Sequence, residues 1–201
     1  MIDQGDFLAN ANVSRETLAR LESYARQLTI WNKRINLVSP KSLDDLWQRH
    51  FLDSLQLLRV APPWATWVDL GSGGGFPGAV VAIANPDRQV TLMESDARKC
   101  AFLRTIARET TGFQVVNERI EDAEPQSADV VSARALAPLD KLLTYASRHL
   151  DPNGRAVFLK GRKAREEIEV ALENWRFDCE TFPSETDEEA VILSIGDIER
   201  V

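Results

Sequence analysis

Cysteine, long apolar runs and an excess of positive charge are all scarce in this sequence of 201 residues. The two cysteines, Cys100 and Cys179, have neither the number expected of a disulfide framework nor the spacing of a metal site. We therefore expect no bound metal and a reducing compartment, the cytoplasm. The chain also lacks an apolar stretch long enough to cross a bilayer and a charged and then apolar signal segment at its start. These absences predict a protein that neither spans a membrane nor is secreted.

Acidic residues outnumber basic ones, with 31 Asp and Glu against 24 Lys and Arg and a formal net charge of -7. This balance argues against a protein that coats nucleic acid through its overall charge, so contact with nucleic acid would require a local basic patch. With 44% hydrophobic residues, the chain can bury one substantial core. We expect a small helical cap over residues 1–62 and one compact unit over residues 63–201, acting as a monomer.

Hydrophobic periodicity predicts two helices followed by alternating strands and helices. Apolar side chains recur at helical spacing over residues 14–31 and 42–59. Beyond them the expected strands are 67–70, 89–93, 113–117, 128–133 and 155–159, and the expected helices are 77–84, 97–109, 138–149 and 163–174. Alternation at this spacing is typical of an α/β protein with a parallel sheet and helices on both faces. The last two apolar runs, 176–182 and 190–195, predict a closing antiparallel hairpin.

A glycine-rich segment follows the first of these strands. Asp69 lies at the end of the apolar run, and five glycines fall among the eight residues from Gly71 to Gly78. Glycine has no Cβ and readily adopts positive φ, so such a loop can bring bare amides against a ligand, while Pro77 suits the first turn of the next helix. We interpret the segment as a cradle for a nucleoside-bearing cofactor.

The register of the glycines separates two classes of cofactor. Taken alone, the run from Gly73 to Gly78 satisfies the dinucleotide pattern G-x-G-x-x-G. The first glycine after the strand is Gly71, however, and Gly71-x-Gly73-x-Gly75 after an acidic strand residue is the arrangement of methyltransferases. Glu94, at the end of the next strand, can accept hydrogen bonds from both ribose hydroxyls of S-adenosylmethionine. That cofactor has no pyrophosphate, in agreement with a loop that has no basic residue.

A basic cluster follows the last parallel strand. Lys160, Arg162 and Lys163 lie at the edge where ligands bind in such sheets. Cations at a helix N-terminus oppose the helix dipole, which favours contact with RNA phosphates over a merely solvated helix start. Lys33 and Arg34 are candidates to extend this patch.

The segment Arg49-His50-x-x-Asp53-Ser54 allows two interpretations. Arg49 and Asp53 are four residues apart, as are His50 and Ser54, so each pair shares one helix face. Spacing alone favours a surface ion pair between Arg49 and Asp53, with His50 partly buried beside it. The alternative places Arg49 and His50 at the border of the cofactor cleft, facing RNA.

Five motifs of this chain occur together and in order. They are Trp31 to Ser39 (WNKRINLVS), Arg49-His50-x-x-Asp53-Ser54, the loop from Asp69 to Gly78, Ala133-Arg134-Ala135 and Leu159-Lys160-Gly161. The set resembles the RsmG family, also called glucose-inhibited division protein B, of bacterial small-subunit ribosomal RNA guanine-N7 methyltransferases. The resemblance covers about residues 25–165.

This resemblance implies the class I S-adenosylmethionine-dependent methyltransferase fold, a Rossmann-like, mostly parallel seven-stranded sheet. It implies S-adenosylmethionine as donor and, as acceptor, guanine 527 in the 530 loop of 16S ribosomal RNA, free or in the small ribosomal subunit. The family motifs imply cofactor contacts for Gly71, Phe76, Ile120, Glu121 and Arg134, and Arg134 is also the candidate catalytic residue. Asp69, Gly73 and Glu94 complete the expected cofactor site.

Two other functions use some of these features. An NAD(P)-dependent oxidoreductase would share the glycine loop but needs an acid or base for hydride transfer, for which the sequence offers His50 and His149. A non-catalytic RNA-binding module would keep the basic patch without needing Asp69, Gly71 or Glu94. Methylation of guanine N7 needs no general base, because N7 is unprotonated and nucleophilic in the neutral base. The chain accordingly shows no Ser/His/Asp pattern.

Overall fold

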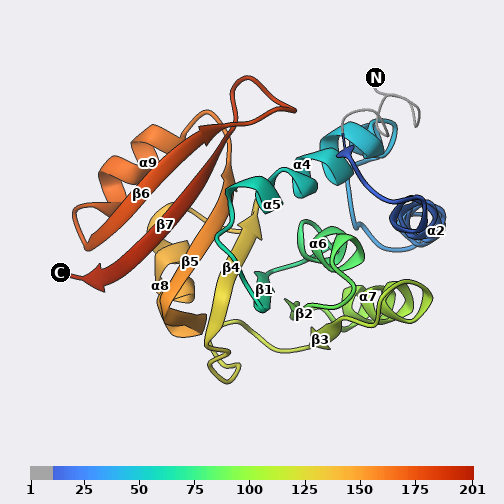
Figure 1. The fold of residues 1–201 in the computed structure, drawn as a ribbon, viewed down its shortest axis with the longest axis horizontal. Coiled ribbons are helices and arrows are strands. Elements are labelled where there is room, and N and C mark those ends of the chain that lie inside the picture. Colours follow the sequence, from blue (N-terminus) through green and yellow to red (C-terminus); the bar gives the residue numbers. More distant parts are fainter. Residues whose placement is uncertain (1–10) are drawn as a thin grey trace.

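The computed structural model describes residues 11–201, whose strands form one seven-stranded sheet in the order β3-β2-β1-β4-β5-β7-β6 (Figure 1). The strands are β1 (Thr66–Leu70), β2 (Gln89–Met93), β3 (Gln114–Val116), β4 (Ala128–Arg134), β5 (Leu150–Lys160), β6 (Trp175–Pro183) and β7 (Val191–Arg200). The first five are parallel to one another, whereas β7 is antiparallel to both β5 and β6. The predicted parallel sheet and its closing hairpin are therefore confirmed.

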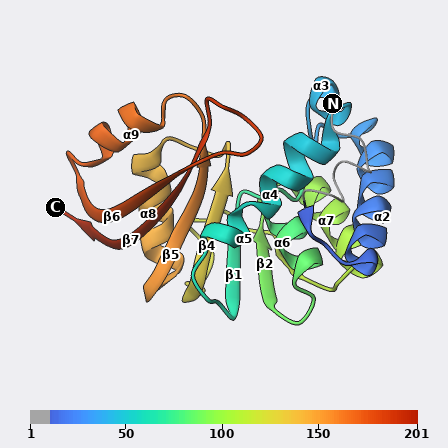
Figure 2. The same ribbon diagram turned by 45° about the horizontal axis from the view of Figure 1, so that its top comes forward.

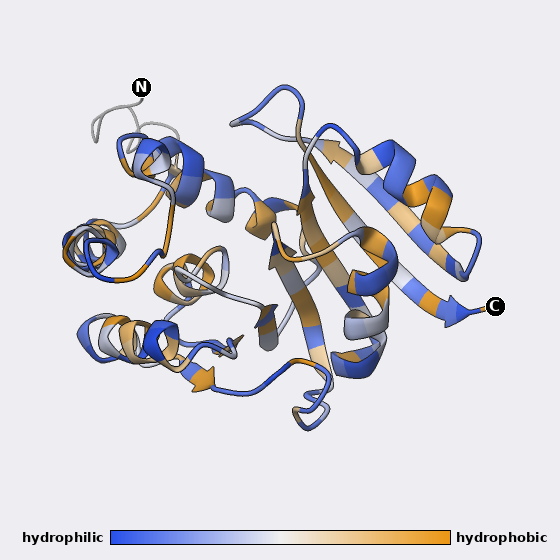
Figure 3. Cartoon of the chain, turned by 180° about the vertical axis from the view of Figure 1, so that it is seen from behind, coloured by the Kyte–Doolittle hydropathy of each residue, from blue (hydrophilic) through white to orange (hydrophobic). Residues whose placement is uncertain are grey.

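Helices cover both faces of this sheet (Figure 2). One face carries α6 (Gly78–Ala84) and α7 (Ala97–Glu109), and the other carries α8 (Leu139–His149) and α9 (Ala164–Ala171). Each face has its own cluster of buried apolar side chains. The central strands are apolar along most of their length because both of their faces are buried (Figure 3).

The longest helix before β1, α2 (Arg15–Asn32), forms a third layer outside α6 and α7. This helix starts at Ser14, whose side chain accepts a hydrogen bond from the amide of Thr17. It packs against α6 and α7, and its buried side chains belong to the same apolar cluster as theirs. The boundary predicted after residue 62 thus separates segments that share one core, and it stays a prediction.

The single helix expected over residues 42–59 is wrong. The segment forms α3 (Pro40–Leu43), a π-helical turn η1 (Trp47–Leu52), α4 (Asp53–Leu55) and α5 (Leu57–Val60). A π-helical turn contains one more residue than an α-turn, so it shifts the faces of the helix on either side. In η1 the shift buries both His50 and Phe51, which are adjacent in sequence.

Three bounds differ from expectation by three residues or more, two of them because strand pairing extends the element. Strand β5 starts at Leu150 instead of residue 155, since Leu150 pairs with Ala128 ahead of an irregularity in the β4–β5 ladder. Strand β7 continues to Arg200, which pairs with Trp175 of β6. Helix α9 ends at Ala171, three residues earlier than expected. The loops after β1, β2, β4 and β5 all leave from the same edge of the sheet, where the predicted site residues lie.

Candidate active site

The glycine loop after β1 adopts the conformation that its composition predicts. Gly71, Gly73 and Gly75 have φ values of +63°, +55° and +95°, a region that residues with side chains rarely adopt. A Cβ on Gly71 would lie 2.5 Å from Cδ1 of Leu136, so this glycine also permits close packing of the loop after β4. A Cβ on Gly73 would meet its nearest neighbour at 3.8 Å, so φ alone requires glycine there.

Asp69 lies behind this loop, completely buried. The hydroxyl of Ser132 donates to its Oδ1 at 2.7 Å, and Nε1 of Trp67 donates to the same hydroxyl at 2.8 Å. Burial raises the pKa of Asp69 to about 6, although the hydrogen bonds around the carboxyl oppose that shift. A Cβ on Gly78 would lie 2.5 Å from Cβ of Asp69, so the start of α6 rests directly on the aspartate. Asp69 therefore supports the loop from within the fold.

Glu94 joins the end of β2 to the glycine loop. Its Oε2 accepts a hydrogen bond from the amide of Gly73 at 3.0 Å, and its Oε1 accepts one from the amide of Asp96 at 2.8 Å. The carboxylate is 8% exposed and faces a cavity of about 350 Å³. Each carboxylate oxygen has two lone pairs, so Glu94 can still accept from a ligand hydroxyl.

This first cavity, which we call the donor cavity, gathers five of the predicted cofactor residues. They are Gly71, Gly73, Glu94, Ile120 and Glu121. Bare glycine backbone with a buried carboxylate bonded to it fits a ribose-bearing ligand. Sequence reasoning missed Lys99, Lys141 and Tyr145, which also line the cavity. Lys141 and Tyr145 lie one turn apart on α8, the helix that follows the Arg134 motif, and this spacing was the available signal.

A second cavity, of about 650 Å³, opens beside the first and is called here the acceptor cavity. Its lining includes Ser39, Ser42, Arg49, His50, Asp53, Arg134, Lys160, Gly161, Glu167, Thr186 and Asp187. Ala135 and Leu136, directly after β4, line both cavities. One two-residue segment thus forms a shared wall between them.

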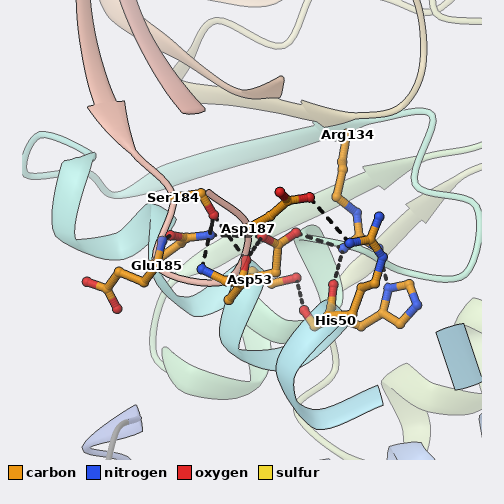
Figure 4. A network of polar contacts seen from close by, with 10 residues as sticks. His50, Asp53, Arg134, Ser184, Glu185 and Asp187 are labelled. Carbon is orange, nitrogen blue, oxygen red and sulfur yellow. Dashed lines mark hydrogen bonds and ion pairs between the residues drawn. The ribbon is translucent and has the colours of Figure 1, made fainter. Parts of the chain in front are cut away.

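Arg134 organises one side of the acceptor cavity (Figure 4). Its Nη1 donates to Oδ2 of Asp53 and to the carbonyl oxygen of Arg49, each at 3.0 Å. Its Nη2 lies 2.6 Å from Nδ1 of His50, and its guanidinium carbon lies 5.0 Å from the centre of the Phe76 ring. Phe76 is buried beneath Arg134 and His50, so it lines neither cavity.

His50 is held as a neutral imidazole. Burial lowers its pKa to about 3, with further lowering by the charges of Arg134 and Arg49. The ring stacks on Phe76 with centroids 4.5 Å apart. With its Nδ1 unprotonated, His50 accepts from Arg134, so the guanidinium is bound on two sides.

The loop between β6 and β7 closes the same network from the far end of the chain (Figure 4). The hydroxyl of Thr186 donates to Oδ1 of Asp53 at 2.7 Å. Asp187 lies 3.5 Å from Nη1 of Arg49. The surface ion pair between Arg49 and Asp53 that spacing alone favoured does not form, because Asp53 pairs with Arg134 and Arg49 pairs with Asp187.

Lys160 lines the acceptor cavity from the end of β5, the strand beside β4, with its side chain 9% exposed. Its Nζ donates to the carbonyl oxygen of Ala137 at 3.1 Å and lies 2.5 Å from Oε2 of Glu167. The amide of Leu139 donates to the same oxygen at 2.8 Å. Lys160 is thus paired within the fold.

The remaining predicted RNA residues are exposed. Arg162 and Lys163 precede α9, next to Gly161 at the rim of the acceptor cavity. Lys33 and Arg34 follow α2 and line neither cavity. Of the residues predicted to contact RNA, Arg49, His50 and Lys160 line the acceptor cavity.

Two properties of the described residues bear on other kinds of site. Over residues 11–201, no helix is both long and apolar enough to cross a membrane. The same part of the chain holds no group of three or more His, Cys, Asp or Glu side chains placed to hold a metal ion.

Known proteins resemble this chain closely. The family model for rRNA small subunit methyltransferase G matches residues 17–189. A "Ribosomal RNA small subunit methyltransferase G" from Ruegeria sp. (strain TM1040) is 53% identical over 195 residues, which are 94% of this chain and 95% of the relative. One of the same name from Gluconobacter oxydans (strain 621H) is 50% identical over 192 residues, 94% of this chain and 98% of the relative.

Solved structures with low sequence identity share the fold. The ribosomal protein L11 methylase of Lactobacillus delbrueckii subsp. bulgaricus matches 72% of this chain and 76% of its own, with a TM-score of 0.57 at 18% identity. M. jannaschii TYW2, solved in complex with AdoMet, matches 84% of this chain and 80% of its own, with a TM-score of 0.56 at 14% identity. The fold is that of class I methyltransferases, as predicted.

Proposed function

The chain belongs to the rRNA small subunit methyltransferase G family, and from this premise we propose that it methylates N7 of a guanine in bacterial 16S ribosomal RNA with S-adenosylmethionine as donor. The target is the guanine at position 527 in the 530 loop. The observation that carries the proposal is the pair of cavities that share the wall formed by Ala135 and Leu136. Both cavities are lined by residues of one chain, which supports a monomer. We also propose that it acts in the cytoplasm, as its ribosomal RNA substrate requires.

The donor cavity has the groups that S-adenosylmethionine requires. Glu94 is positioned to accept from the ribose hydroxyls, and the backbone of Gly71 and Gly73 allows close approach. Ile120 offers an apolar surface, and Glu121 adds negative charge at the rim. When bound, S-adenosylmethionine supplies a methyl group carried on a positively charged sulfur.

The acceptor cavity suits a flipped-out base. Its lining combines apolar surface from Leu136 and Leu159 with the charged groups of Arg134 and Lys160. Guanine N7 has an in-plane lone pair and no proton to lose, so these residues need only orient the base and exclude water. Asp53 and Glu167 supply negative charge near the purine, which becomes positive during the reaction.

The histidines argue against the oxidoreductase alternative. Nδ1 of His50 accepts a hydrogen bond from Arg134, and the pKa of about 3 makes the neutral ring a very weak base. His149 is completely buried, with its Nε2 2.9 Å from the carbonyl oxygen of Ile120. Neither residue is placed to exchange a proton with a substrate. A non-catalytic RNA-binding module would have no use for the buried bonds between Glu94 and the glycine loop.

Exposed cations at the acceptor rim are proposed to bind the RNA backbone. Arg49, Arg162 and Lys163 are exposed there, and Lys33 with Arg34 would extend the contact along the end of α2. Lys160 is paired with Glu167, so its role is to hold that carboxylate beside the base.

The experiment is to incubate the protein with radiolabelled S-adenosylmethionine and unmodified 16S RNA or small subunits, and then to map the labelled base. We expect one guanine in the 530 loop, with the borohydride-sensitive, alkali-labile product of N7 methylation. The single-turnover rate at saturating substrates should not rise through neutral pH, because no general base takes part. A label on an exocyclic amine, a ribose or a pyrimidine would contradict the proposal.

A further inference from the structure

We propose that Glu167 recognises the target guanine by accepting a hydrogen bond from its 2-amino group. This inference rests on the proposed function and adds a specificity-determining residue to it. Glu167 lies in the first turn of α9 and lines the acceptor cavity with a side chain that is 25% exposed.

The two oxygens of this carboxylate have different surroundings. Oε2 is fixed by Nζ of Lys160 at 2.5 Å and by the amide of Leu139 at 2.8 Å. The second oxygen, Oε1, accepts no hydrogen bond from any of residues 11–201. Anchoring one oxygen from two directions fixes the side chain, which leaves the other oxygen as an oriented acceptor at the cavity.

The other carboxylates of the acceptor cavity already contact protein groups with both of their oxygens. Both oxygens of Asp53 accept hydrogen bonds, from Arg134 on one side and from Thr186 on the other. Asp187 pairs with Arg49 and accepts from the amide of Glu189. Glu167 is therefore the carboxylate in this cavity that has an oriented oxygen to offer.

The shape of guanine agrees with this position. N7 lies on one edge of the purine, and N1–H and the 2-amino group lie toward the opposite edge. The shared wall at Ala135 and Leu136 adjoins the donor cavity, whereas Glu167 is anchored beyond that wall, by the amide of Leu139 and by Lys160. A base whose N7 points toward the donor cavity turns its donor edge away from the wall, and in our proposal that edge meets Glu167. Adenine has no 2-amino group and presents an unprotonated N1, which a carboxylate would repel.

The test compares guanine with inosine at the target position of the same RNA. Inosine retains N7 and N1–H but lacks the 2-amino group, so it removes the proposed partner of Glu167. We expect wild-type kcat/KM to be about 10- to 100-fold higher for guanine than for inosine. Glu167→Ala should lower the guanine value and bring the ratio close to one. Because both substrates meet the same variant, a general loss of folding or of Lys160 placement cancels in the ratio.

Two further variants complete the test. Glu167→Gln keeps the side-chain length if the alanine variant does not fold, and it should reduce the ratio partially. Glu166→Ala is the matched control, because Glu166 is exposed on the same turn and does not line the acceptor cavity. Its ratio should equal that of the wild type.

The outcomes separate this inference from the proposed function. Wild-type protein that methylates guanine while Glu167→Ala or Glu167→Gln keeps the full preference would overturn the recognition role alone. An equal collapse of the ratio in Glu166→Ala would overturn it as well. A wild-type protein that leaves guanine N7 unmethylated would remove both the inference and the function on which it rests.

Discussion

Nη2 of Arg134 lies 2.6 Å from Nδ1 of His50. If the imidazole were protonated, the two positive charges would repel each other. The contact holds because buried His50 stays neutral and accepts the hydrogen bond. Asp53 supplies the negative partner on the other branch of the guanidinium. Arg134 is thereby fixed at the end of β4, next to the wall between the two cavities.

Arg134→Lys should lower the single-turnover methyl-transfer rate by about 100-fold, because an ammonium cannot bind Asp53 and His50 in the same planar arrangement. Stopped reactions with labelled S-adenosylmethionine and saturating RNA measure that rate. Arg155→Lys is the control, since Arg155 also bonds two residues, Asp178 and Ser194, but lies on the β5–β7 side away from both cavities. Equal rates for the two variants would show that the guanidinium geometry is unimportant.

Gly73→Val should weaken S-adenosylmethionine binding by about 100-fold or more while the protein remains folded, because the new side chain disturbs a positive-φ backbone that faces the donor cavity. Calorimetric titration gives the affinity. Gly112→Val imposes the same kind of strain at φ +73°, with no neighbour within 4 Å and at a distance from the donor cavity. The control should lose stability but keep its affinity for S-adenosylmethionine. A Gly73→Val variant that binds S-adenosylmethionine as tightly as the wild type would refute the donor site.

Two buried groups give the stability opposite dependences on pH. The pKa of Asp69 is raised to about 6, so the folded state retains a proton that the unfolded state has lost, and stability falls as pH rises from about 4 to 6. The pKa of His50 is lowered to about 3, so the unfolded state takes up a proton first, and stability falls as pH drops from about 6.5 toward 3.

Asp69→Asn should therefore remove the loss of stability that ionisation of Asp69 causes between pH 4 and 6. As pH rises over that range, the unfolding free energy of the variant should increase more than that of the wild type, by at most ~3 kcal/mol. His50→Gln should flatten the same part of the curve. Urea titrations at several pH values between 4 and 8 measure both effects. If the Asp69→Asn curve runs parallel to that of the wild type, Asp69 does not carry a raised pKa.

Charge reversal of Arg162 and Lys163 to glutamate should weaken RNA binding and lower its salt dependence. The slope of the logarithm of the binding constant against the logarithm of the salt concentration should become smaller in magnitude by about one for each lost phosphate contact. Filter binding at several salt concentrations measures the slope, and S-adenosylmethionine affinity should not change. Arg15→Glu with Arg20→Glu is the control, because Arg20 lies beside Ala84 and Pro86, at the edge of the sheet where the parallel strands begin. An unaltered slope in the first double variant would take these residues out of the interface.

The sequence predicts most of the fold because its signals are local. The bounds of β2 and α7 match expectation to the residue, since apolar runs, the polar turn between them and the capping side chain of Asp96 lie within about twenty residues. The donor cavity could be predicted in outline for the same reason. Glycine loops and acidic residues at the ends of parallel strands meet at one edge whatever the details of packing.

The acceptor cavity depends on contacts between distant residues and could not be predicted in detail. Asp53 bonds to Arg134 and to Thr186, which lie 81 and 133 residues further along the chain. The chain has 24 basic residues, and local spacing favoured Arg49 as the partner of Asp53. The π-helical turn that reorients this segment has no clear sequence signal. The pairing of Lys160 with Glu167 likewise depends on how α9 packs beside the end of β5.

The place of β7 between β5 and β6 has a consequence for how the protein is made. Strand β6 is synthesised first but joins the sheet through β7, so it has no partner until the residues up to Arg200 have left the ribosome. Until then the edge of β5 is also open to pairing with other chains. The loop that brings Thr186 to Asp53 is fixed in the same step. A nascent chain can therefore complete its donor cavity early, while its acceptor cavity is finished only after β7 has been synthesised.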